Sequence, residues 1–166
     1  MNDYEQEILR LRELLARERN VARTDALTGI GNRLLFEETL IQLPGDSVLI
    51  LLDAANLHTA NNVLGLSGGD TLLQRVAAAV REYDYVFRIG GDEFAVLLVG
   101  TTVEQARAVA ERIQAQVGYT RLTDSAYFFV AAGVARAADR DGADAAMRED
   151  KKRRKNDLGT PTEVRS

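Results

Sequence analysis

The sequence predicts an α+β fold, in which helices pack on a mainly antiparallel sheet. Two continuous apolar runs, 48–52 and 94–99, have the length and composition of strands buried on both faces. A Gly-Gly pair separates the second run from an apolar stretch at 85–89, a pattern typical of a tight antiparallel hairpin. Helical segments separate these strands from one another and from a fourth strand. The predicted order is therefore β-α-β-β-α-β, the ferredoxin-like split βαβ arrangement, with further helices at both ends.

The composition narrows the class of protein. The chain has 166 residues, enough for one domain and a short appendage. Hydrophobic residues make up 46% and charged residues 28%, so a packed soluble core is expected. No apolar run is long enough to cross a membrane, and the first residues do not resemble a signal peptide. There is no cysteine, which excludes disulfides and fits a cytoplasmic location.

Charge and histidine content limit the possible ligands. The net charge of −4 argues against general nucleic-acid binding. His58 is the single histidine, so a multi-histidine metal site is excluded. A metal ion would have to be held by oxygen atoms, which favours Mg²⁺ or Mn²⁺.

Residues 1–24 form a separate segment with an apolar repeat at spacings of four, three and four. Glu18 interrupts the repeat before Ala22 resumes it. We expect a helix that belongs to a parallel coiled coil, although two heptads are too few to be stable alone. The alternative is a helix that lies on its own domain. The repeat consists of Tyr4, Ile8, Leu11 and Leu15.

The first half of the domain is predicted as follows. Residues 24–33 form a structured loop, and a helix over 34–41 is ended by Pro44-Gly45. The first core strand covers 47–53 and ends in Asp53.

A short, broken helix should follow that strand and end at Gly65. A firm helix should then begin at residues 67–70, where Ser67 and Asp70 fit a capping box, and carry apolar residues up to position 80.

The second half contains an amphipathic helix over 102–117 and a buried strand over 127–134. A polar loop at 136–142 precedes a last helix over 143–156, and residues 163–165 are predicted as a short edge strand.

Three carboxylates mark the region where the first strand meets the hairpin. Asp92 and Glu93 follow the Gly-Gly pair directly, and Asp53 ends the first strand. Two carboxylates about 4 Å apart repel by roughly 4 kcal/mol in a partly screened site, which a divalent cation could offset. A solvated hairpin tip is the plainer interpretation of Asp92 and Glu93 alone.

The motif Gly-Gly-Asp-Glu-Phe at 90–94 resembles the signature of GGDEF domains, the diguanylate cyclases that condense two GTP molecules into cyclic di-GMP. Residues 25–33 look like the D-x-L-T-G-x-x-N-R opening of that family. Residues 61–70 are similar to its N-D-x-x-G-H-x-x-G-D stretch. The resemblance implies a GGDEF domain over 25–166, with a core like that of nucleotide cyclases and polymerase palms, after a helical stalk at 1–24.

The resemblance also implies the site residues. Asp53, Asp92 and Glu93 would be catalytic, and the same three side chains with the Ala54 carbonyl would hold Mg²⁺ or Mn²⁺. The guanine base and the phosphates would be bound by Asn61, Asp70, Lys151 and Lys155.

An R-x-x-D motif ends at Asp84, with five residues between it and the first signature glycine. By resemblance, Arg81 and Asp84 would form an inhibitory site for the product, cyclic di-GMP. Outside this resemblance, a charged helix end before a strand explains the same residues.

The resemblance implies a nucleotidyltransferase that works as a homodimer, with the stalk relaying a signal from an upstream sensor domain. The sequence departs from the family pattern at Ala55, His58 and Leu66, and has Arg154 where the pattern has glycine and Lys155 where it has arginine. A catalytically inactive domain that acts as a receptor for cyclic di-GMP or GTP is therefore the alternative function.

Overall fold

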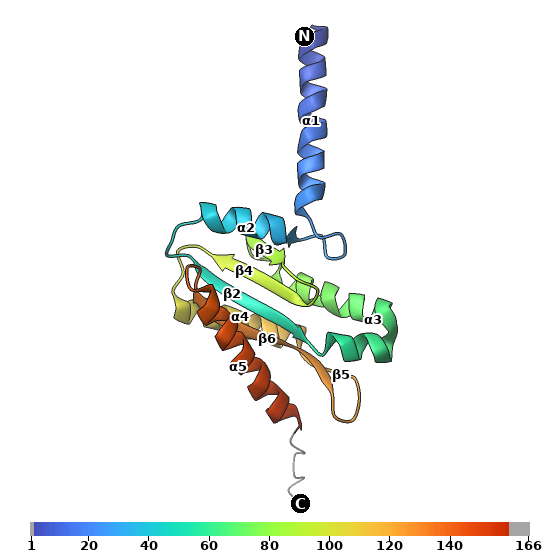
Figure 1. Cartoon of the computed structure of the whole chain (residues 1–166), viewed down its shortest axis with the longest axis vertical. Helices are drawn as coiled ribbons and strands as arrows, with labels where there is room; N and C mark the ends of the chain where they lie inside the picture. The colour runs from blue at the N-terminus through green and yellow to red at the C-terminus, as the bar shows by residue number, and fades with distance from the viewer. Residues whose placement is uncertain (1, 160–166) are drawn as a thin grey trace, which may run out of the picture.

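A computed structural model describes residues 2–159 as a six-stranded sheet with helices on both of its faces (Figure 1). The strands are β1 (Gly31–Asn32), β2 (Val48–Ala55), β3 (Tyr85–Arg88), β4 (Glu93–Leu98), β5 (Thr120–Arg121) and β6 (Tyr127–Arg136). The helices are α1 (Asp3–Arg23), α2 (Arg33–Gln42), α3 (Leu57–Val80), α4 (Val103–Val117) and α5 (Arg140–Gly159).

The sheet has the order β1-β3-β4-β2-β6-β5. Strands β1 and β3 run parallel, and the other neighbouring strands pair antiparallel. The succession β2-α3-β3-β4-α4-β6 confirms the predicted β-α-β-β-α-β core. Strands β1 and β5 were not predicted, because two residues are too few to show an alternating pattern.

Strand β2 is the centre of two hydrophobic cores. All eight of its residues are buried, and successive side chains point to opposite faces of the sheet. Ile50 and Leu52 pack with residues of α3 and α4, whereas Leu49 and Leu51 pack with residues of α2 and α5. Asp53 continues the second of these sets, so its side chain faces the side of the sheet that α5 covers.

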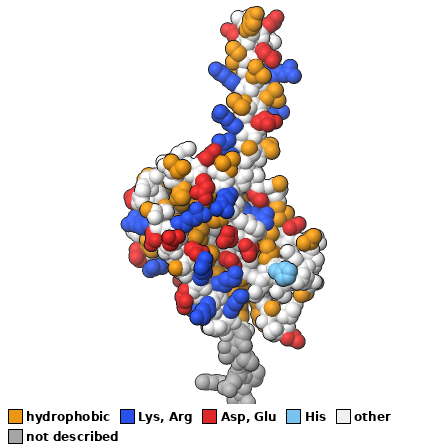
Figure 2. All heavy atoms as spheres, viewed as in Figure 1, with side chains coloured by type: hydrophobic (Ala, Val, Ile, Leu, Met, Phe, Trp, Pro, Cys, Tyr) orange, Lys and Arg blue, Asp and Glu red, His pale blue; other side chains and the backbone are white. Residues whose placement is uncertain are grey.

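Helix α1 extends away from the domain, and none of its residues is buried (Figure 1). The alternative of a helix lying on its own domain is therefore wrong for this structure. Its last turn is tied to the domain by an ion pair from Arg23 to Glu38 at 2.7 Å and by a hydrogen bond from Asn32 Nδ2 to the Ala22 carbonyl at 2.8 Å. Figure 2 shows apolar side chains exposed along this helix among charged ones.

Several predicted boundaries differ in the structure. The predicted break at Gly65 is confirmed: α3 spans Leu57–Val80 but consists of two helices that meet at a kink, where Gly65 has a non-helical backbone with φ of 75°. Strand β2 continues to Ala55 because the residues after Asp53 still pair with β6. Helix α5 is longer at both ends than predicted. The strand predicted at 163–165 lies outside the described residues. Within 2–159, no helix is long and apolar enough to span a bilayer.

Candidate active site

The predicted carboxylates lie at one end of the sheet, where β2 meets the β3–β4 turn. Asp53 is the register partner of Glu93 across the β2–β4 pair. The Ala54 N–H donates to the Asp92 carbonyl at 2.7 Å, so the turn backbone is bonded to the end of β2. In a strand, the N–H and carbonyl of one residue point to the same side, so the Ala54 carbonyl also faces this turn.

Lys151 of α5 reaches the same place. Its ammonium lies 2.7 Å from Asp53 Oδ1. Asp53 is only 8% exposed, and this oxygen has no hydrogen bond of good geometry within the described chain. The Lys151 ammonium therefore gives the buried Asp53 carboxylate a partner of opposite charge.

The donor atoms here fit a hard divalent cation, because a buried carboxylate oxygen and a backbone carbonyl at a strand end are ligands that Mg²⁺ accepts. Over residues 2–159, however, no three acidic, histidine or cysteine side chains are grouped closely enough to hold a metal ion. Strand pairing places Asp53, Asp92 and Glu93 as neighbours along the backbone, while their carboxylates do not converge.

The Glu93 side chain folds back over the turn. A Cβ atom placed on Gly90 would lie 2.7 Å from Glu93 Oε2, so a side chain at position 90 would displace the Glu93 carboxylate. Glu93 also lines a hollow of about 210 Å³ beside the N-terminal turns of α5, with Arg140 and Asp144 on its other side.

The side chain of Arg88 holds the β3–β4 turn in place. This residue was not identified in the sequence analysis. Its Nη2 donates to the Gly91 carbonyl at 2.6 Å, and its Nη1 lies 3.3 Å from Asp25 Oδ1. Burial raises the pKa of Asp25, but hydrogen bonds from the Thr28 hydroxyl and amide and the charge of Arg88 outweigh it. The pKa of Asp25 is therefore below its usual value. A charged residue within a hairpin strand was the signal available in the sequence.

The predicted guanine-binding residues, Asn61 and Asp70, lie on the two halves of α3. In a straight helix, residues 61 and 69 would be about 12 Å apart along the axis. The non-helical backbone at Gly65 brings the halves together, so that a Cβ atom on Gly69 would lie 1.7 Å from Asn61 Oδ1. The structure thus places Asn61 beside the residue that precedes Asp70.

Lys155 lies one turn after Lys151 on α5. It lines a hollow of about 220 Å³ with Asn56, Tyr127 and Phe129. Asn56 follows β2 directly, has a left-handed backbone with φ of 64° and donates from Nδ2 to the Tyr127 carbonyl at 2.7 Å. The two lysines therefore lie along the side of the sheet end where β2 passes into α3.

Arg81 and Asp84 lie at the opposite end of α3 and are both exposed. Arg81 Nη2 donates to the Thr28 carbonyl at 2.6 Å, so this side chain rests on the loop that holds Asp25. Asp84 lines a hollow of about 190 Å³ with Glu82, Tyr83 and residues 97–99. The structure directs these two side chains toward different neighbours.

Arg112 of α4 adds a cation to the same region, which the sequence analysis missed. It pairs with Glu82 at 3.1 Å and stacks on the Tyr83 ring. Burial raises the pKa of the Tyr83 hydroxyl, and the nearby Arg112 only partly opposes this.

The sheet order and the turn bonded to the end of β2 define an α+β domain with the β-α-β-β-α-β core. The family model for the GGDEF domain of diguanylate cyclases matches residues 22–157, and this chain belongs to that family.

Individual relatives agree with this assignment. Diguanylate cyclase DgcP of Pseudomonas aeruginosa is 34% identical over 128 residues, which are 70% of this chain and 19% of that protein. A cyclic di-GMP phosphodiesterase of the same organism, NbdA, is 35% identical over 106 residues, or 57% of this chain and 14% of that protein. This chain therefore spans less than a third of either relative.

Solved structures share the fold. The coiled coil and GGDEF domain of DgcB from Caulobacter crescentus, crystallised with c-di-GMP, gives a TM-score of 0.78 at 24% identity. The match covers 90% of this chain and 91% of that one.

Proposed function

We propose that this chain is a diguanylate cyclase, a nucleotidyltransferase that converts two GTP molecules into cyclic di-GMP and two pyrophosphates. The observation that carries the proposal is the end of β2, where the Ala54–Asp92 backbone bond and the Lys151–Asp53 ion pair join the signature turn to helix α5. Membership of the GGDEF family supports it.

The two ends of GTP would be bound by different helices. Asn61 and Asp70 of α3 would accept and donate hydrogen bonds at the guanine edge, where Asp70 suits the adjacent N–H donors of that base. Lys151 and Lys155 of α5 would bind the phosphates through charge-assisted hydrogen bonds. In this scheme the Lys151 ammonium exchanges its Asp53 partner for a phosphate oxygen.

The reaction forms one phosphodiester bond in each of two steps. The 3′-hydroxyl oxygen of one GTP bonds to the α-phosphorus of the other, and the bond to pyrophosphate breaks. Glu93, beside the turn, would accept the proton of the 3′-hydroxyl. Asp53, the Ala54 carbonyl, Asp92 and Glu93 would hold the divalent cation, Mg²⁺ or Mn²⁺, which neutralises phosphate charge when bound.

Catalysis would require a homodimer, because each domain binds one GTP and the two must face each other. Helix α1 has no buried residue and exposes the apolar side chains that a second copy could cover. Structural likeness to a domain described with its coiled coil supports this role for α1. An upstream sensor domain would act through the same helix.

Inhibition by the product at Arg81 and Asp84 is part of the proposal. Both side chains are exposed, and Arg112 supplies a further cation beside them. Arginine can stack on or bond a guanine, while the Asp84 carboxylate can accept from its N–H groups.

The test is incubation of the purified chain with GTP and Mg²⁺, followed by separation of the nucleotides. The unmodified chain should form cyclic di-GMP, and Asp92→Asn or Glu93→Gln should abolish its formation while the thermal unfolding temperature stays unchanged. Glu104→Gln, at an exposed position of α4, is the matched control and should remain active. Tight binding of cyclic di-GMP without any turnover would contradict the cyclase and favour the receptor.

A further inference from the structure

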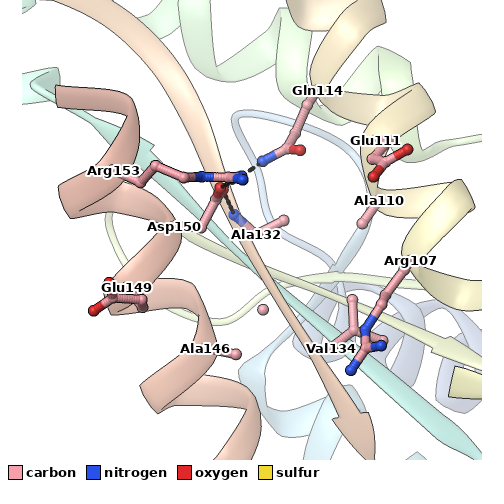
Figure 3. Close-up of a pocket in the computed structure, with 11 residues that line it drawn as sticks. Arg107, Ala110, Glu111, Gln114, Ala132, Val134, Ala146, Glu149, Asp150 and Arg153 are labelled. Carbon is pink, nitrogen blue, oxygen red and sulfur yellow. Dashed lines mark hydrogen bonds and ion pairs between the residues drawn. The ribbon is translucent and has the colours of Figure 1, made fainter. Parts of the chain in front are cut away.

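Asp150 of α5 is buried in a network that joins three elements (Figure 3). Its Oδ2 accepts hydrogen bonds from Gln114 Nε2 of α4 at 2.7 Å, from the Ala132 N–H of β6 at 2.9 Å and from Arg154 Nε at 2.9 Å. Its Oδ1 accepts from Arg153 Nη2 at 2.5 Å. Burial raises the pKa of Asp150, but these four donors outweigh it and the pKa lies below its usual value.

The network satisfies backbone groups at the outer edge of β6. Strand β5 pairs only with the first two residues of β6, so the following residues have no strand neighbour on that side. There, Gln114 Nε2 donates to the Val130 carbonyl at 3.0 Å, and Asp150 accepts from the Ala132 N–H. Side chains of α4 and α5 thus take the place of a further strand.

Arg154 is fully engaged in this network. Beyond the bond to Asp150, its Nη2 donates to Gln114 Oε1 at 2.6 Å and its Nη1 donates to the Tyr119 hydroxyl at 2.8 Å. The side chain is only 18% exposed. Arg154 therefore ties α5 to α4, and all three of its side-chain nitrogens donate hydrogen bonds.

Helix α5 has a second fixed point on the same strand. A Cβ atom placed on Gly133 would lie 2.0 Å from the Ala143 carbonyl oxygen and 2.4 Å from the Met147 nitrogen. The helix backbone therefore rests directly on β6. Contact at Gly133 sets the distance of α5 from the sheet, and the network at Asp150 sets its rotation about its own axis.

Rotation of α5 determines where its lysines point. Lys151 follows Asp150 by one residue, which is about 100° around the helix, and Lys155 lies roughly one turn further on. With Asp150 held against β6, Lys151 is directed to Asp53 of β2, and its ammonium is 2.7 Å from that carboxylate.

We propose that Asp150 and Arg154, together with Gln114, form a clamp that positions Lys151 and Lys155 for the triphosphate. Asp150 and Arg154 are positioning residues in this scheme, since they act through α5 and do not touch the substrate. The inference rests on the proposed function, because it takes the phosphates to lie beside Lys151.

The test compares binding of a non-hydrolysable GTP analogue with binding of GMP, which lacks two of the phosphates. In Arg154→Ala, the dissociation constant of the analogue should rise about tenfold, while that of GMP should change less than about twofold. The matched control is Arg148→Ala on the same helix, where the arginine is 77% exposed and pairs with Asp144. It should leave both constants unchanged.

A loss of folding stability alone would weaken the binding of both ligands, and would not raise the dissociation constant of the GTP analogue while leaving that of GMP nearly unchanged. Should Arg154→Ala fold poorly, the double variant Asp150→Ala/Arg154→Ala leaves no unpaired buried charge and should show the same selective loss for the analogue. If Lys151→Ala loses the preference for the analogue but neither clamp variant does, the clamp is refuted and the proposed function stands. If the unmodified chain has no preference for the analogue over GMP, the proposed function fails and the clamp with it.

Discussion

Asp25 shows how a single carboxylate holds the start of the domain to the signature turn. It accepts from the Thr28 amide at 2.9 Å and from the Thr28 hydroxyl at 2.6 Å, and it pairs with Arg88. Burial works against the charged form, but these partners outweigh it and lower the pKa of Asp25 below 3.8. A carboxylate whose pKa is lowered on folding stabilises the fold above its unfolded pKa and loses that contribution as the pH falls through its folded pKa.

We therefore predict that Asp25→Asn lowers the free energy of unfolding by about 2 kcal/mol at pH 7, the scale of hydrogen bonds to a charged group. The difference from the unmodified chain should shrink as the pH is lowered below 3.8, the ordinary value for this carboxyl. Urea unfolding at pH 7 and at acidic pH measures both quantities. Asp124→Asn, at a fully exposed carboxylate, is the control and should have no effect. A difference that did not vary with pH would contradict the assignment.

Arg81 is a second single residue with a testable role, in the proposed inhibition by cyclic di-GMP. Its guanidinium is exposed but rests on the Thr28 carbonyl at 2.6 Å. Arg81→Ala should weaken inhibition by cyclic di-GMP at least about tenfold, because a charged hydrogen-bond partner of that size is lost. Inhibition curves of initial rate against added product measure this, with Arg107→Ala on α4 as the control. An unchanged curve would place the inhibitory site elsewhere.

Residues that belong to a local sequence motif could be predicted. Residues whose role depends on a contact with a residue far away in the sequence could not. Asp53 was predicted at a strand end and Asp92 and Glu93 at a turn, and the structure places all three near one end of the β2–β4 pair. Arg88 finds Asp25 63 residues away, and Asp150 finds Gln114 36 residues away. No local pattern specifies such pairs, because they exist only once the helices have packed on the sheet.

At the scale of helices and strands, the apolar pattern predicted most elements but not all of their ends. The apolar spacing of the long strands and helices predicted the β-α-β-β-α-β core. Gly65 indicated a break, and the structure has a non-helical backbone there, so that two helices meet at a kink within α3. The ends of α2 and α4 were predicted to within one residue, whereas α5 is three residues longer at each end, since its terminal turns lack the apolar positions that reveal a helix.

The kink of α3 at Gly65 leads to a prediction for a substitution at Gly69. A Cβ atom there would lie 1.7 Å from Asn61 Oδ1, the end of a flexible side chain, so Gly69→Ala should displace Asn61 with little loss of folding stability. We expect the KM for GTP to rise about tenfold, which corresponds to roughly 1.4 kcal/mol. Steady-state kinetics and a thermal melt measure the two effects. Gly45→Ala, with nothing within 4 Å of the added methyl group, is the control. A normal KM would show that Asn61 does not bind the base.

At the scale of the whole molecule, a 21-residue helix stands without tertiary cover. A single helix of this length is only marginally stable in water, and its exposed apolar side chains include Ile8, Leu11 and Leu15. Association with a second copy would bury these side chains and hold two domains together.

Removal of residues 2–22 should therefore make the specific activity rise steeply with protein concentration, because two domains would have to meet without a tether. Activity across a hundredfold range of concentration, with sedimentation of both forms, measures this. The full chain should change little over the same range. If the truncated chain had constant specific activity, the role of α1 in dimerisation would be wrong.

Helix α1 is attached to the domain only at its C-terminal end, so a small tilt at that end moves its N-terminal tip by a larger distance. A helix of 21 residues is about 31 Å long, so a tilt of about 10° at its base carries the far tip by about 5 Å. The fulcrum is the loop at 24–32, where Gly31 pairs with Phe87 and the adjoining Arg88 holds the signature turn. In the proposed cyclase, we expect a push at the tip to reach the turn at Asp92 through this loop as a much smaller displacement, and a displacement of about 1 Å is enough to change a reaction rate about a hundredfold.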